Sequence, residues 1–261
     1  MDLKLKNKKA FISGSTKGIG YAIAKRLGEE GATVTINGRS EDSVNKALKS
    51  LKKEVSNGKF YGEICDFSNA LAVGELIEKL EKIDILVNNV GIFKNIDFEE
   101  IKDEDWQQIY DVNVMSGVRL SRAFLPEMKK NDWGRIVFIS SESAVNIPVE
   151  MIHYGMSKTA QLAISRGIAE TTKGTGVTVN SVLPGPTLSD GVKNMTGMDE
   201  GKSRKEVEKQ FFNTERPTSI IQRFADPDEV ANMVAYVVSP LASATNGAAL
   251  RVDGGVIKTI Y

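Results

Sequence analysis

The stretch Arg135–Arg166, RIVFISSESAVNIPVEMIHYGMSKTAQLAISR, contains an apolar strand, a serine-rich turn and a helical segment in direct succession. The strand covers Ile136–Ile139, and Tyr154 and Lys158 stand four residues apart in the helix, so both project from one face. Ser141 lies at the end of the strand. A phenol, an ammonium and a hydroxyl that converge form a candidate acid–base site. A Tyr–Lys pair alone is more often an ordinary exposed or half-buried helix face, so the rest of the chain must decide.

The composition excludes several classes of protein. The 261 residues include 34 Lys and Arg and 34 Asp and Glu, so the net charge gives no general attraction to nucleic acid or anionic membranes. One cysteine, Cys65, and one histidine cannot form an intramolecular disulfide or a His/Cys zinc site. No apolar run has the length of a signal peptide or a membrane span. We therefore expect a soluble cytoplasmic protein with no metal site, no nucleic-acid partner and no membrane association.

A glycine-rich turn between a predicted strand, Ala10–Ser13, and a predicted amphipathic helix, Ile19–Glu30, indicates a phosphate site. Backbone N–H groups and the helix dipole at such a helix start favour an anion, and glycines allow the backbone to approach it closely. The spacing is G-x-x-x-G-x-G rather than G-x-G-x-x-G. A tight connection without a ligand is the alternative. We predict that the turn binds a dinucleotide through Gly14, Ser15, Thr16, Lys17, Gly18, Ile19 and Gly20.

The predicted second strand, Thr33–Ile36, ends in Asn37-Gly38-Arg39-Ser40. In a dinucleotide-binding fold the residue at this strand end faces the adenosine ribose, where a carboxylate would accept a hydrogen bond from the free 2′-hydroxyl. Asn37 is neutral at that point, and Arg39 with Lys17 can bracket a 2′-phosphate. This pattern favours NADP over NAD, the alternative being that Arg39 simply lies in solvent.

The remaining chain alternates apolar runs with amphipathic segments and shows no internal repeat, low-complexity segment or linker. Seven strands alternating with helices predict one domain, residues 1–261, with a Rossmann-type, doubly wound, mostly parallel seven-stranded α/β sheet and helices on both faces. The predicted strands are Ala10–Ser13, Thr33–Ile36, Lys59–Ile64, Ile83–Val87, Ile136–Ile139, Val177–Leu183 and Ala248–Val252. The predicted helices are Ile19–Glu30, Ser43–Val55, Ala70–Glu81, Asp103–Lys130, the segment of Tyr154, and Asp226–Ser239, where Asp226 suits the N-cap and Pro227 the first turn.

Polar residues interrupt this pattern where strands end. Asp66 can hydrogen-bond an adenine amino group or cap the helix that starts near Asn69. The run Asn88-Asn89-Val90-Gly91 follows the fourth strand. Pro184 cannot continue the sixth strand, so Pro184-Gly185-Pro186-Thr187 is predicted to be a ligand loop. Asn113 lies inside a predicted helix, where its amide competes for backbone hydrogen bonds; a kink, a polar relay or plain exposure would each explain it.

The segment Ser189–Thr218 is the least regular part of the chain, rich in Gly, Lys and Glu but carrying a few large apolar residues. Such a composition is typical of a lid over an apolar ligand, and an ordinary pair of surface helices is the alternative. We predict a substrate lid around residues 188–217. His153 points about 100° away from Tyr154 on an ideal helix, so we expect a structural role for it. The predicted pocket lining is Ser143, Ile147, His153, Thr187, Met195 and Phe211, which does not identify a compound.

Taken in order, these motifs resemble the classical short-chain dehydrogenase/reductase family over essentially the whole chain. Each motif is modest alone, but their order and spacing together are highly specific. Ser13 stands where threonine is usual and keeps the hydroxyl, and Val90 stands where alanine is usual. The matching elements are Ser13-Gly14-xxx-Gly18-x-Gly20, Asp66, Asn88-Asn89-Val90-Gly91, Asn113, Ser141, Tyr154-xxx-Lys158 and Pro184-Gly185.

The resemblance implies an oxidoreductase that transfers a hydride between NADP(H) and a ketone or secondary alcohol. Tyr154 would be the general acid or base, Ser141 would hydrogen-bond the reacting oxygen, and Asn113 would hold a water in a relay to Lys158. Lys158 would hold the nicotinamide ribose and lower the Tyr154 pKa, since an ammonium about 4 Å away at a dielectric near 20 contributes roughly 4 kcal/mol. The implied cofactor-binding residues are the Gly14–Gly20 turn, Arg39, Asp66, Asn88, Gly91, Tyr154, Lys158, Pro184, Gly185 and Thr187.

Several alternatives remain at this level. Ser140 and Ser143 are also close to the strand end, but the thirteen-residue spacing to Tyr154 favours Ser141 as the catalytic serine. The Tyr-xxx-Lys spacing argues against the family's enoyl reductases, in which the two residues are further apart. A cofactor-binding sensor without turnover is the alternative from another class. The family also implies a homotetramer, with interfaces on the helices of Asn113 and Tyr154 and on the C-terminal segment Ala248–Tyr261.

A 3-oxoacyl-[acyl-carrier-protein] reductase is the closest alternative enzyme. Similar reductases tend to carry basic residues before the fifth and sixth strands, where this chain has Asp132 and Thr175. Lys129, Lys130 and Lys173 lie nearby in the sequence. The pattern therefore weakens, without excluding, the expectation of an acyl-carrier-protein partner.

Overall fold

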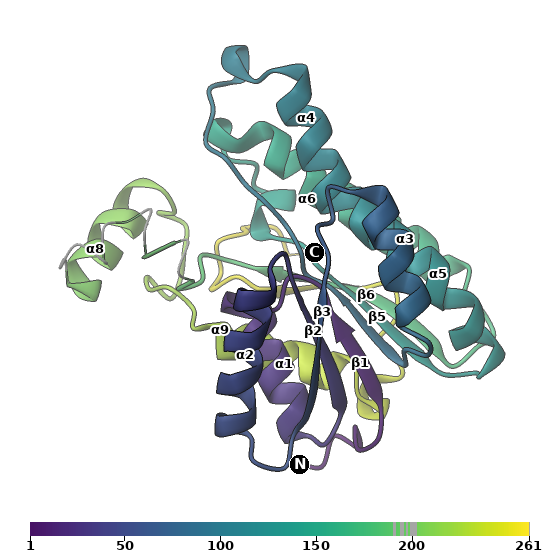
Figure 1. The fold of residues 1–261 in the computed structure, drawn as a ribbon. Coiled ribbons are helices and arrows are strands. Elements are labelled where there is room, and N and C mark those ends of the chain that lie inside the picture. Colours follow the sequence, from purple (N-terminus) through teal and green to yellow (C-terminus); the bar gives the residue numbers. More distant parts are fainter. Residues whose placement is uncertain (190–191, 194–195, 197, 199–202, 261) are drawn as a thin grey trace.

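The computed structural model contains the predicted alternation of strands and helices (Figure 1). It describes residues 1–189, 192–193, 196, 198 and 203–260. All seven strands pair in parallel, in the order β3-β2-β1-β4-β5-β6-β7, which confirms the predicted sheet. The strands are β1 (Lys9–Ile12), β2 (Thr33–Gly38), β3 (Lys59–Ile64), β4 (Ile85–Asn88), β5 (Gly134–Ile139), β6 (Val177–Pro184) and β7 (Ala249–Val252).

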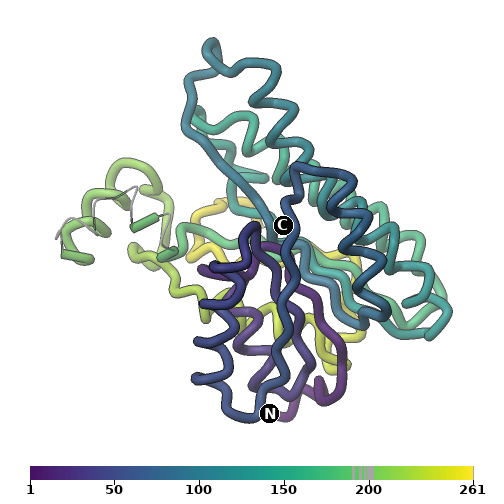
Figure 2. Tube along the Cα trace, viewed as in Figure 1, coloured from purple at the N-terminus to yellow at the C-terminus, as the bar shows by residue number. Residues whose placement is uncertain are grey.

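Helices cover both faces of the sheet, as Figures 1 and 2 show. One face carries α1 (Gly18–Glu29), α2 (Glu41–Glu54) and α9 (Pro227–Val237), whose apolar residues share one core with β1 and β2. The other carries α3 (Ala70–Lys79), α5 (Ser116–Lys130) and α6 (Ile152–Glu170). Because β4, β5 and β6 lie between two helical layers, every one of their residues is buried, which explains their nearly continuous apolar sequences.

Two elements lie outside these layers. Helix α4 (Asp103–Ile109) lies against the start of α6, and α8 (Arg204–Thr214) stands apart from the sheet in Figure 1. Short 3₁₀ turns cover Phe98–Glu100, Glu142–Ala144, Val149–Met151 and Pro240–Ala242. Helix α8 brings part of the predicted lid segment over the carboxyl ends of the strands.

Two local expectations need correction, and a third is confirmed. The predicted helix Asp103–Lys130 is interrupted, because Tyr110–Met115 between α4 and α5 form a π-helix. Pro184 is the last residue of β6, not the first after it; its missing N–H removes only a bond at the strand end, and Gly185 donates its N–H to the Val252 carbonyl instead. The N-terminus of α9 is as predicted, with Asp226 at the N-cap and Pro227 at the first position.

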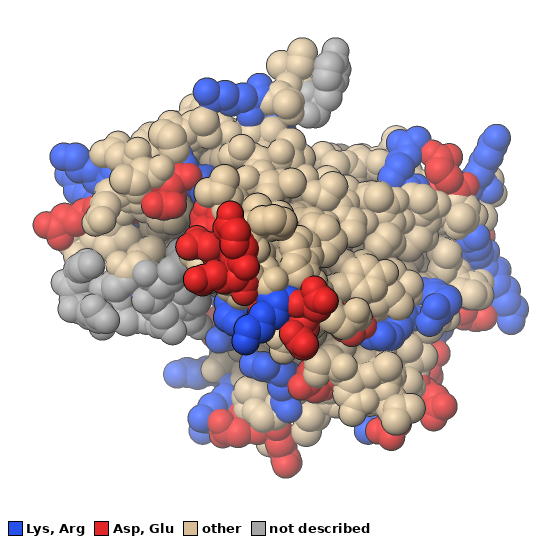
Figure 3. All heavy atoms as spheres, turned by 90° about the horizontal axis from the view of Figure 1, so that it is seen from above, with Lys and Arg blue, Asp and Glu red and all other residues tan. Residues whose placement is uncertain are grey.

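The surface agrees with the balanced composition on the face that Figure 3 shows, where Lys and Arg residues are interspersed with Asp and Glu. Within the described part of the chain, no helix is both long and apolar enough to cross a membrane. The same residues contain no group of three or more His, Cys, Asp or Glu side chains arranged to hold a metal ion.

Candidate active site

A pocket of about 600 Å³ lies at the carboxyl ends of β4, β5 and β6, where parallel sheets of this kind bind their ligands. Residues at and just beyond the ends of these strands line it: Asn89 and Gly91, Ser140 to Ser143, and Pro184 to Thr187. Helix α6 contributes Tyr154 and Lys158. The sequence elements that we singled out separately therefore meet at one place.

Lys158 is fixed at the base of this pocket. Its Nζ donates to the Ile139 carbonyl at 2.9 Å and to Gln161 Oε1 at 3.4 Å, and it lies 5.5 Å from the centroid of the Tyr154 ring. The ring of Phe93 packs edge-on against Tyr154, with centroids 6.1 Å apart. The two side chains thus share one wall of the pocket, as their spacing on the helix predicts.

The pKa values of these two groups differ from our expectation. Burial raises the pKa of the Tyr154 phenol to about 12, and a hydrogen bond with Ser141 opposes that rise. Burial also lowers the pKa of Lys158 to about 7. The expectation that Lys158 lowers the Tyr154 pKa is therefore wrong for this structure, because burial disfavours both charged forms and the ammonium is turned toward a backbone carbonyl.

The three serines after β5 have different partners. Ser140 Oγ donates to the Lys158 carbonyl at 2.9 Å, and Ser143 Oγ donates to Glu142 Oε1 at 3.2 Å. Ser141 alone interacts with Tyr154, and its hydroxyl accepts the Ser143 N–H at 3.1 Å. The spacing argument and the geometry thus select the same serine.

Asn113 owes its position to the π-helix. Its side-chain amide exchanges two hydrogen bonds with the backbone of Ile92, at 2.8 and 2.9 Å, and Nδ2 also donates to Ser157 Oγ at 3.0 Å. Its backbone carbonyl accepts Gln161 Nε2 at 2.7 Å. Gln161 therefore bridges the π-helix and the Lys158 ammonium directly. Gln161 was not predicted as a site residue from the sequence. The pattern that could have indicated it is a polar amide on the same helix face as Lys158, about one turn further along.

The glycine-rich turn has the shape of an anion cradle. Gly14 and Gly18 have φ of 61° and 58°, the left-handed region that favours glycine. A Cβ on Gly20 would lie 2.5 Å from Asn89 Nδ2 and 2.6 Å from the Gly14 carbonyl oxygen, so only glycine fits. Lys17, at the N-cap of α1, makes no side-chain capping bond, and Ile19 lines the pocket. The helix N–H groups and this close approach fit the pyrophosphate of a dinucleotide.

Two polar residues of this region, Ser15 and Asn37, make hydrogen bonds within the protein. The Ser15 hydroxyl donates to the Ile12 carbonyl and accepts the Asn37 N–H, while the Ser15 N–H donates to the Asn37 carbonyl. Asn37 is buried and its Oδ1 accepts the Gly14 N–H at 3.0 Å. The expectation that Asn37 faces the ribose is therefore wrong, because its amide holds the turn against β2. Gly38 is the next residue, and a Cβ there would meet Thr16 Cγ2 at 2.6 Å.

Arg39 and Lys17 are both exposed beside this turn, and Thr16 is half-buried. Arg39 makes no hydrogen bond or ion pair with any other residue that the structure describes, but its charge helps to lower the pKa of Asp66. The larger effect on Asp66 comes from Ser68, whose N–H and hydroxyl donate to Asp66 Oδ1 at 2.9 and 2.8 Å. Asn69 caps α3 instead, so the capping alternative for Asp66 is wrong.

The paired amides after β4 divide their roles. Asn88 is turned away from the pocket; its Nδ2 donates to Ser121 Oγ at 3.1 Å. Asn89 lines the pocket and donates to the Ser13 and Gly14 carbonyls at 3.0 and 2.8 Å, which ties β4 to the glycine-rich turn. Gly91 lies beside Lys158, since a Cβ there would be 3.4 Å from Nζ. We predicted Asn88 and not Asn89, because sequence order alone does not tell which amide points outward.

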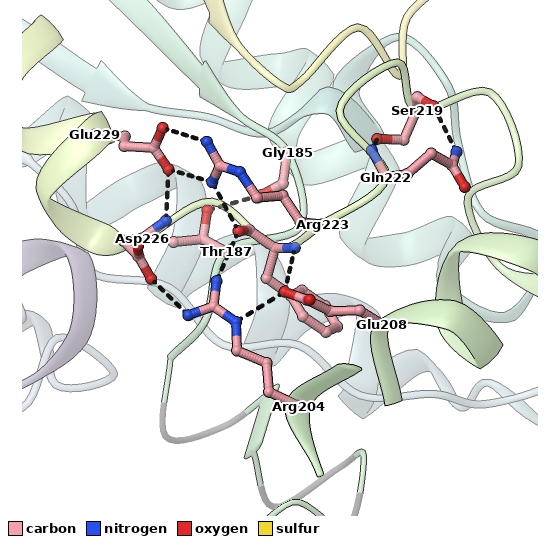
Figure 4. A network of polar contacts seen from close by, with 10 residues as sticks. Gly185, Thr187, Arg204, Glu208, Ser219, Gln222, Arg223, Asp226 and Glu229 are labelled. Carbon is pink, nitrogen blue, oxygen red and sulfur yellow. Dashed lines mark hydrogen bonds and ion pairs between the residues drawn. The ribbon is translucent and has the colours of Figure 1, made fainter. Parts of the chain in front are cut away.

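The segment after β6 contains the predicted ligand loop and leads into the segment that we predicted to be a lid. A Cβ on Gly185 would lie 2.6 Å from the Asp253 carbonyl oxygen, and Thr187 Oγ1 donates to the Gly185 carbonyl at 2.9 Å. Figure 4 shows how α8 is attached beyond this loop. Arg204 donates to Asp226 at 3.3 Å and to the Phe224 carbonyl at 3.2 Å, which joins α8 to the start of α9.

The predicted substrate lining is partly brought together. Ser143, Thr187 and Phe211 line the pocket, as do Val207 and Gln210 of α8. His153 is buried against Trp106, with ring centroids 5.9 Å apart, as expected of a structural residue, and Ile147 is half exposed; neither is a lining residue. Met195 lies outside the described residues. Phe212 is buried in a small aromatic cluster with Phe211 and Phe224, which explains part of the apolar content of this segment.

One ion pair at the same pocket was not predicted from the sequence. Glu142 and Arg216 are 3% and 9% exposed, and Arg216 Nε donates to Glu142 Oε1 at 2.8 Å. Both residues line the pocket beside Ser141. Their separation in the chain hides the contact, because Arg216 follows α8 and Glu142 follows β5.

Known proteins resemble this chain along its length. A family model described as enoyl-(acyl carrier protein) reductase matches residues 14–257. The uncharacterized oxidoreductase YvaG of Bacillus subtilis is 46% identical over the full length of both chains. The 3-oxoacyl-[acyl-carrier-protein] reductase FabG of Aquifex aeolicus is 32% identical, covering 98% of this chain and all of the relative. The crystal structure of L-sorbose reductase from Gluconobacter frateurii, complexed with NADPH and L-sorbose, superposes over all of both chains with a TM-score of 0.92 at 30% identity. With its parallel sheet, its glycine-rich turn and these relatives, the chain belongs to the classical short-chain dehydrogenase/reductase family of oxidoreductases.

Proposed function

We propose that this oxidoreductase interconverts a ketone and a secondary alcohol with NADP(H). The observation that carries the proposal is the convergence of Ser141, Tyr154 and Lys158 in one pocket beside the glycine-rich turn. A bound nicotinamide would supply or accept the hydride. Ser141 positions the substrate oxygen, Tyr154 exchanges a proton with it, and Lys158, fixed by Ile139 and Gln161, holds the ribose side of the cofactor.

A turnover assay tests this proposal. Purified protein is mixed with NADPH and a panel of ketones, and with NADP⁺ and the matching alcohols, and cofactor absorbance is followed. We expect NADPH consumption with at least one ketone. Tight NADPH binding without turnover of any compound in the panel would favour the cofactor-binding sensor and contradict the enzyme.

A preference for NADP over NAD is supported by the surroundings of the adenosine end. Position 38, at the end of β2, is a glycine packed against Thr16 and not a carboxylate, while Arg39 and Lys17 are exposed beside the turn. An exposed arginine without an ion-pair partner in the described chain can bind a 2′-phosphate bidentately. The L-sorbose reductase neighbour is complexed with NADPH. Asp66, Gly91, Pro184, Gly185 and Thr187 remain proposed cofactor contacts.

Replacing Arg39 by Asp should reverse this preference. Loss of a charge-assisted contact and a new repulsion should weaken NADPH binding by about 10- to 100-fold, with NADH binding changed little. Fluorescence titration of both cofactors measures the change. Lys52→Asp, at an exposed site on α2, makes the same change of charge and should leave the NADPH/NADH ratio within about twofold. Equal affinity of the unaltered protein for both cofactors would refute the assignment of Arg39.

Reduction of a 3-oxoacyl group on acyl-carrier protein is the second candidate, since a relative at 32% identity carries that name. Binding of acyl-carrier protein is expected to use basic residues before the fifth and sixth strands, and in this chain Asp132 occupies one of those positions. Its carboxylate accepts the Gly176 N–H at 2.6 Å, beside Thr175. An acidic and a neutral residue meeting there disfavour an acidic protein partner, so we propose a small-molecule substrate.

We further propose a homotetramer in the cytoplasm, with α4, α5, α6 and the C-terminal segment at the interfaces. Exposed aromatic residues, Phe98 and Tyr110, beside α4 support contact with another copy. Sedimentation at micromolar concentration should give about four times the chain mass of 28.5 kDa. A monomer under these conditions would contradict this assembly without affecting the proposed reaction.

A further inference from the structure

Glu142 and Arg216 form a buried ion pair beside Ser141 in the candidate active site. Arg216 Nε donates to Glu142 Oε1 at 2.8 Å, and Ser143 Oγ donates to the same oxygen at 3.2 Å. Arg216 Nη1 donates to the Glu215 carbonyl at 2.8 Å. Burial raises the pKa of Glu142, and Arg216 opposes the rise. The pair therefore joins the loop of the catalytic serine to the segment that follows α8.

Stability alone gives no reason for this arrangement. Removing two charges from water carries a desolvation cost that their attraction only partly offsets, and apolar residues of similar size often stabilise a fold at least as well. The surrounding pocket has apolar walls, including Phe93, Val207 and Phe211, so an apolar pair would fit its chemistry. The charges point instead to recognition of a polar group.

The pair also leaves two polar ends without partners. Glu142 Oε2 is buried and has no hydrogen-bond partner in the described structure. Arg216 uses Nε and Nη1, and Nη2 makes no hydrogen bond to any described residue. One end is an acceptor and the other is a donor. A hydroxyl group both donates and accepts, so it is complementary to both ends.

We propose that the Glu142–Arg216 pair recognises a hydroxyl group next to the reacting carbonyl, so that the substrate class is a neutral α-hydroxyketone or the corresponding 1,2-diol. Glu142 directly follows Ser141, and both line the pocket with Tyr154, so the pair lies next to the groups that would hold the reacting carbonyl. This inference rests on the proposed function and narrows its substrate. Glu142 and Arg216 are specificity-determining residues in it, while the proton transfer stays with Tyr154.

The other charges of the pocket support a neutral substrate. Glu150 and Glu215 also line it, so the pocket has three acidic residues, with Glu142, and two basic ones, Lys158 and Arg216. Because Arg216 is already paired with Glu142, this lining favours a neutral substrate over an anionic one. Asn95, Gln210 and Thr214 add further polar groups to the same pocket.

Matched ketones test the proposal. We would measure kcat/KM with NADPH for hydroxyacetone against acetone, and for acetoin against butanone. The unaltered enzyme should prefer the hydroxylated member of each pair by about 10- to 100-fold. Glu142→Gln and Arg216→Lys should each reduce this ratio by about tenfold, with the change mainly in KM, because the first removes the charge and the second removes the planar fork.

Glu29→Gln is the matched control, since it neutralises another carboxylate that is paired with an arginine, Arg26 of α1, outside the pocket, and it should leave the ratio within about twofold. Circular dichroism and NADPH titration identify any variant that fails to fold, in which case the other single variant carries the test. Turnover of both ketones with a ratio near one in the unaltered enzyme, or an unchanged ratio in both variants, would overturn this inference and leave the proposed function standing. No turnover of any ketone would instead contradict the proposed function.

Discussion

Tyr154→Phe should lower kcat for ketone reduction by about 10²- to 10⁴-fold, the range that a general acid contributes. The phenyl ring keeps its packing against Phe93, while the proton donor at the pocket is lost. NADPH affinity should change little, which a fluorescence titration can show alongside the rate measurement. Tyr236→Phe is the control, because its hydroxyl lies on an exposed side chain of α9, and it should keep full activity. Retained activity in Tyr154→Phe would remove Tyr154 from the mechanism.

The raised pKa of Tyr154 also predicts how the rates of oxidation and reduction depend on pH. A phenol whose pKa is raised to about 12 keeps its proton through the neutral range, so the acid needed for reduction is present there. Oxidation of the alcohol needs the phenolate, whose fraction grows as the pH rises toward the pKa. The rate of oxidation should therefore increase between pH 7 and 10, whereas that of reduction should not. An oxidation rate independent of pH over this interval would contradict a phenolic base with a raised pKa.

Lys158→Met should have the second largest effect, with a loss of kcat of at least about 100-fold. The methionine keeps much of the side-chain volume but cannot donate to the Ile139 carbonyl or to Gln161, and it cannot hold a ribose hydroxyl. Lys158→Arg keeps a positive charge in a different shape and should recover little, because the buried site is fitted to one nitrogen. Activity of Lys158→Met close to that of the unaltered protein would exclude the proposed role.

Lys158→Met, which should lower activity, should increase the free energy of unfolding relative to the unaltered protein as the pH falls. The pKa of Lys158 is about 7 in the folded protein and near 10.4 in an unfolded chain, so the unfolded state binds the extra proton between these values. The cost of burying Lys158 is absent above the unfolded pKa, grows as the pH falls, and is complete below about pH 7. Lys158→Met should therefore gain stability relative to the unaltered protein as the pH is lowered from 10 to 7. Denaturant unfolding at several pH values measures this, and a constant difference would contradict it.

The fold could be predicted from local patterns because each element is marked within a few residues. The buried strand β4 contains the apolar run Ile85–Val87, and α9 begins with Asp226 and Pro227, which suit a helix start. A parallel sheet then follows from the alternation of such strands with helices. The proximity of Tyr154 and Lys158 could be predicted for a similar reason, since their four-residue spacing already places both side chains on one helix face.

The missed features depend on contacts between distant parts of the chain. Asn37 and Asn89 both look like polar residues at strand ends, yet one amide is buried under Gly14 while the other lines the pocket. Gln161 becomes relevant only because the π-helix presents the Asn113 carbonyl to it. The direction of the Tyr154 pKa shift was also not predicted, because a charge–charge argument at an assumed distance omits the burial of both groups.

By itself, the sequence determined the parallel α/β sheet, the family, and the meeting of Ser141, Tyr154 and Lys158 at one pocket, because spacing along a strand or helix fixes which side chains share a face. Only the tertiary structure decided what surrounds them. It buried the phenol and the ammonium, placed Gln161 against Lys158, and brought Arg216 to within 2.8 Å of Glu142. The burial of polar side chains and the contacts between distant residues depend on how separate elements pack, and no local pattern in the sequence marks either one.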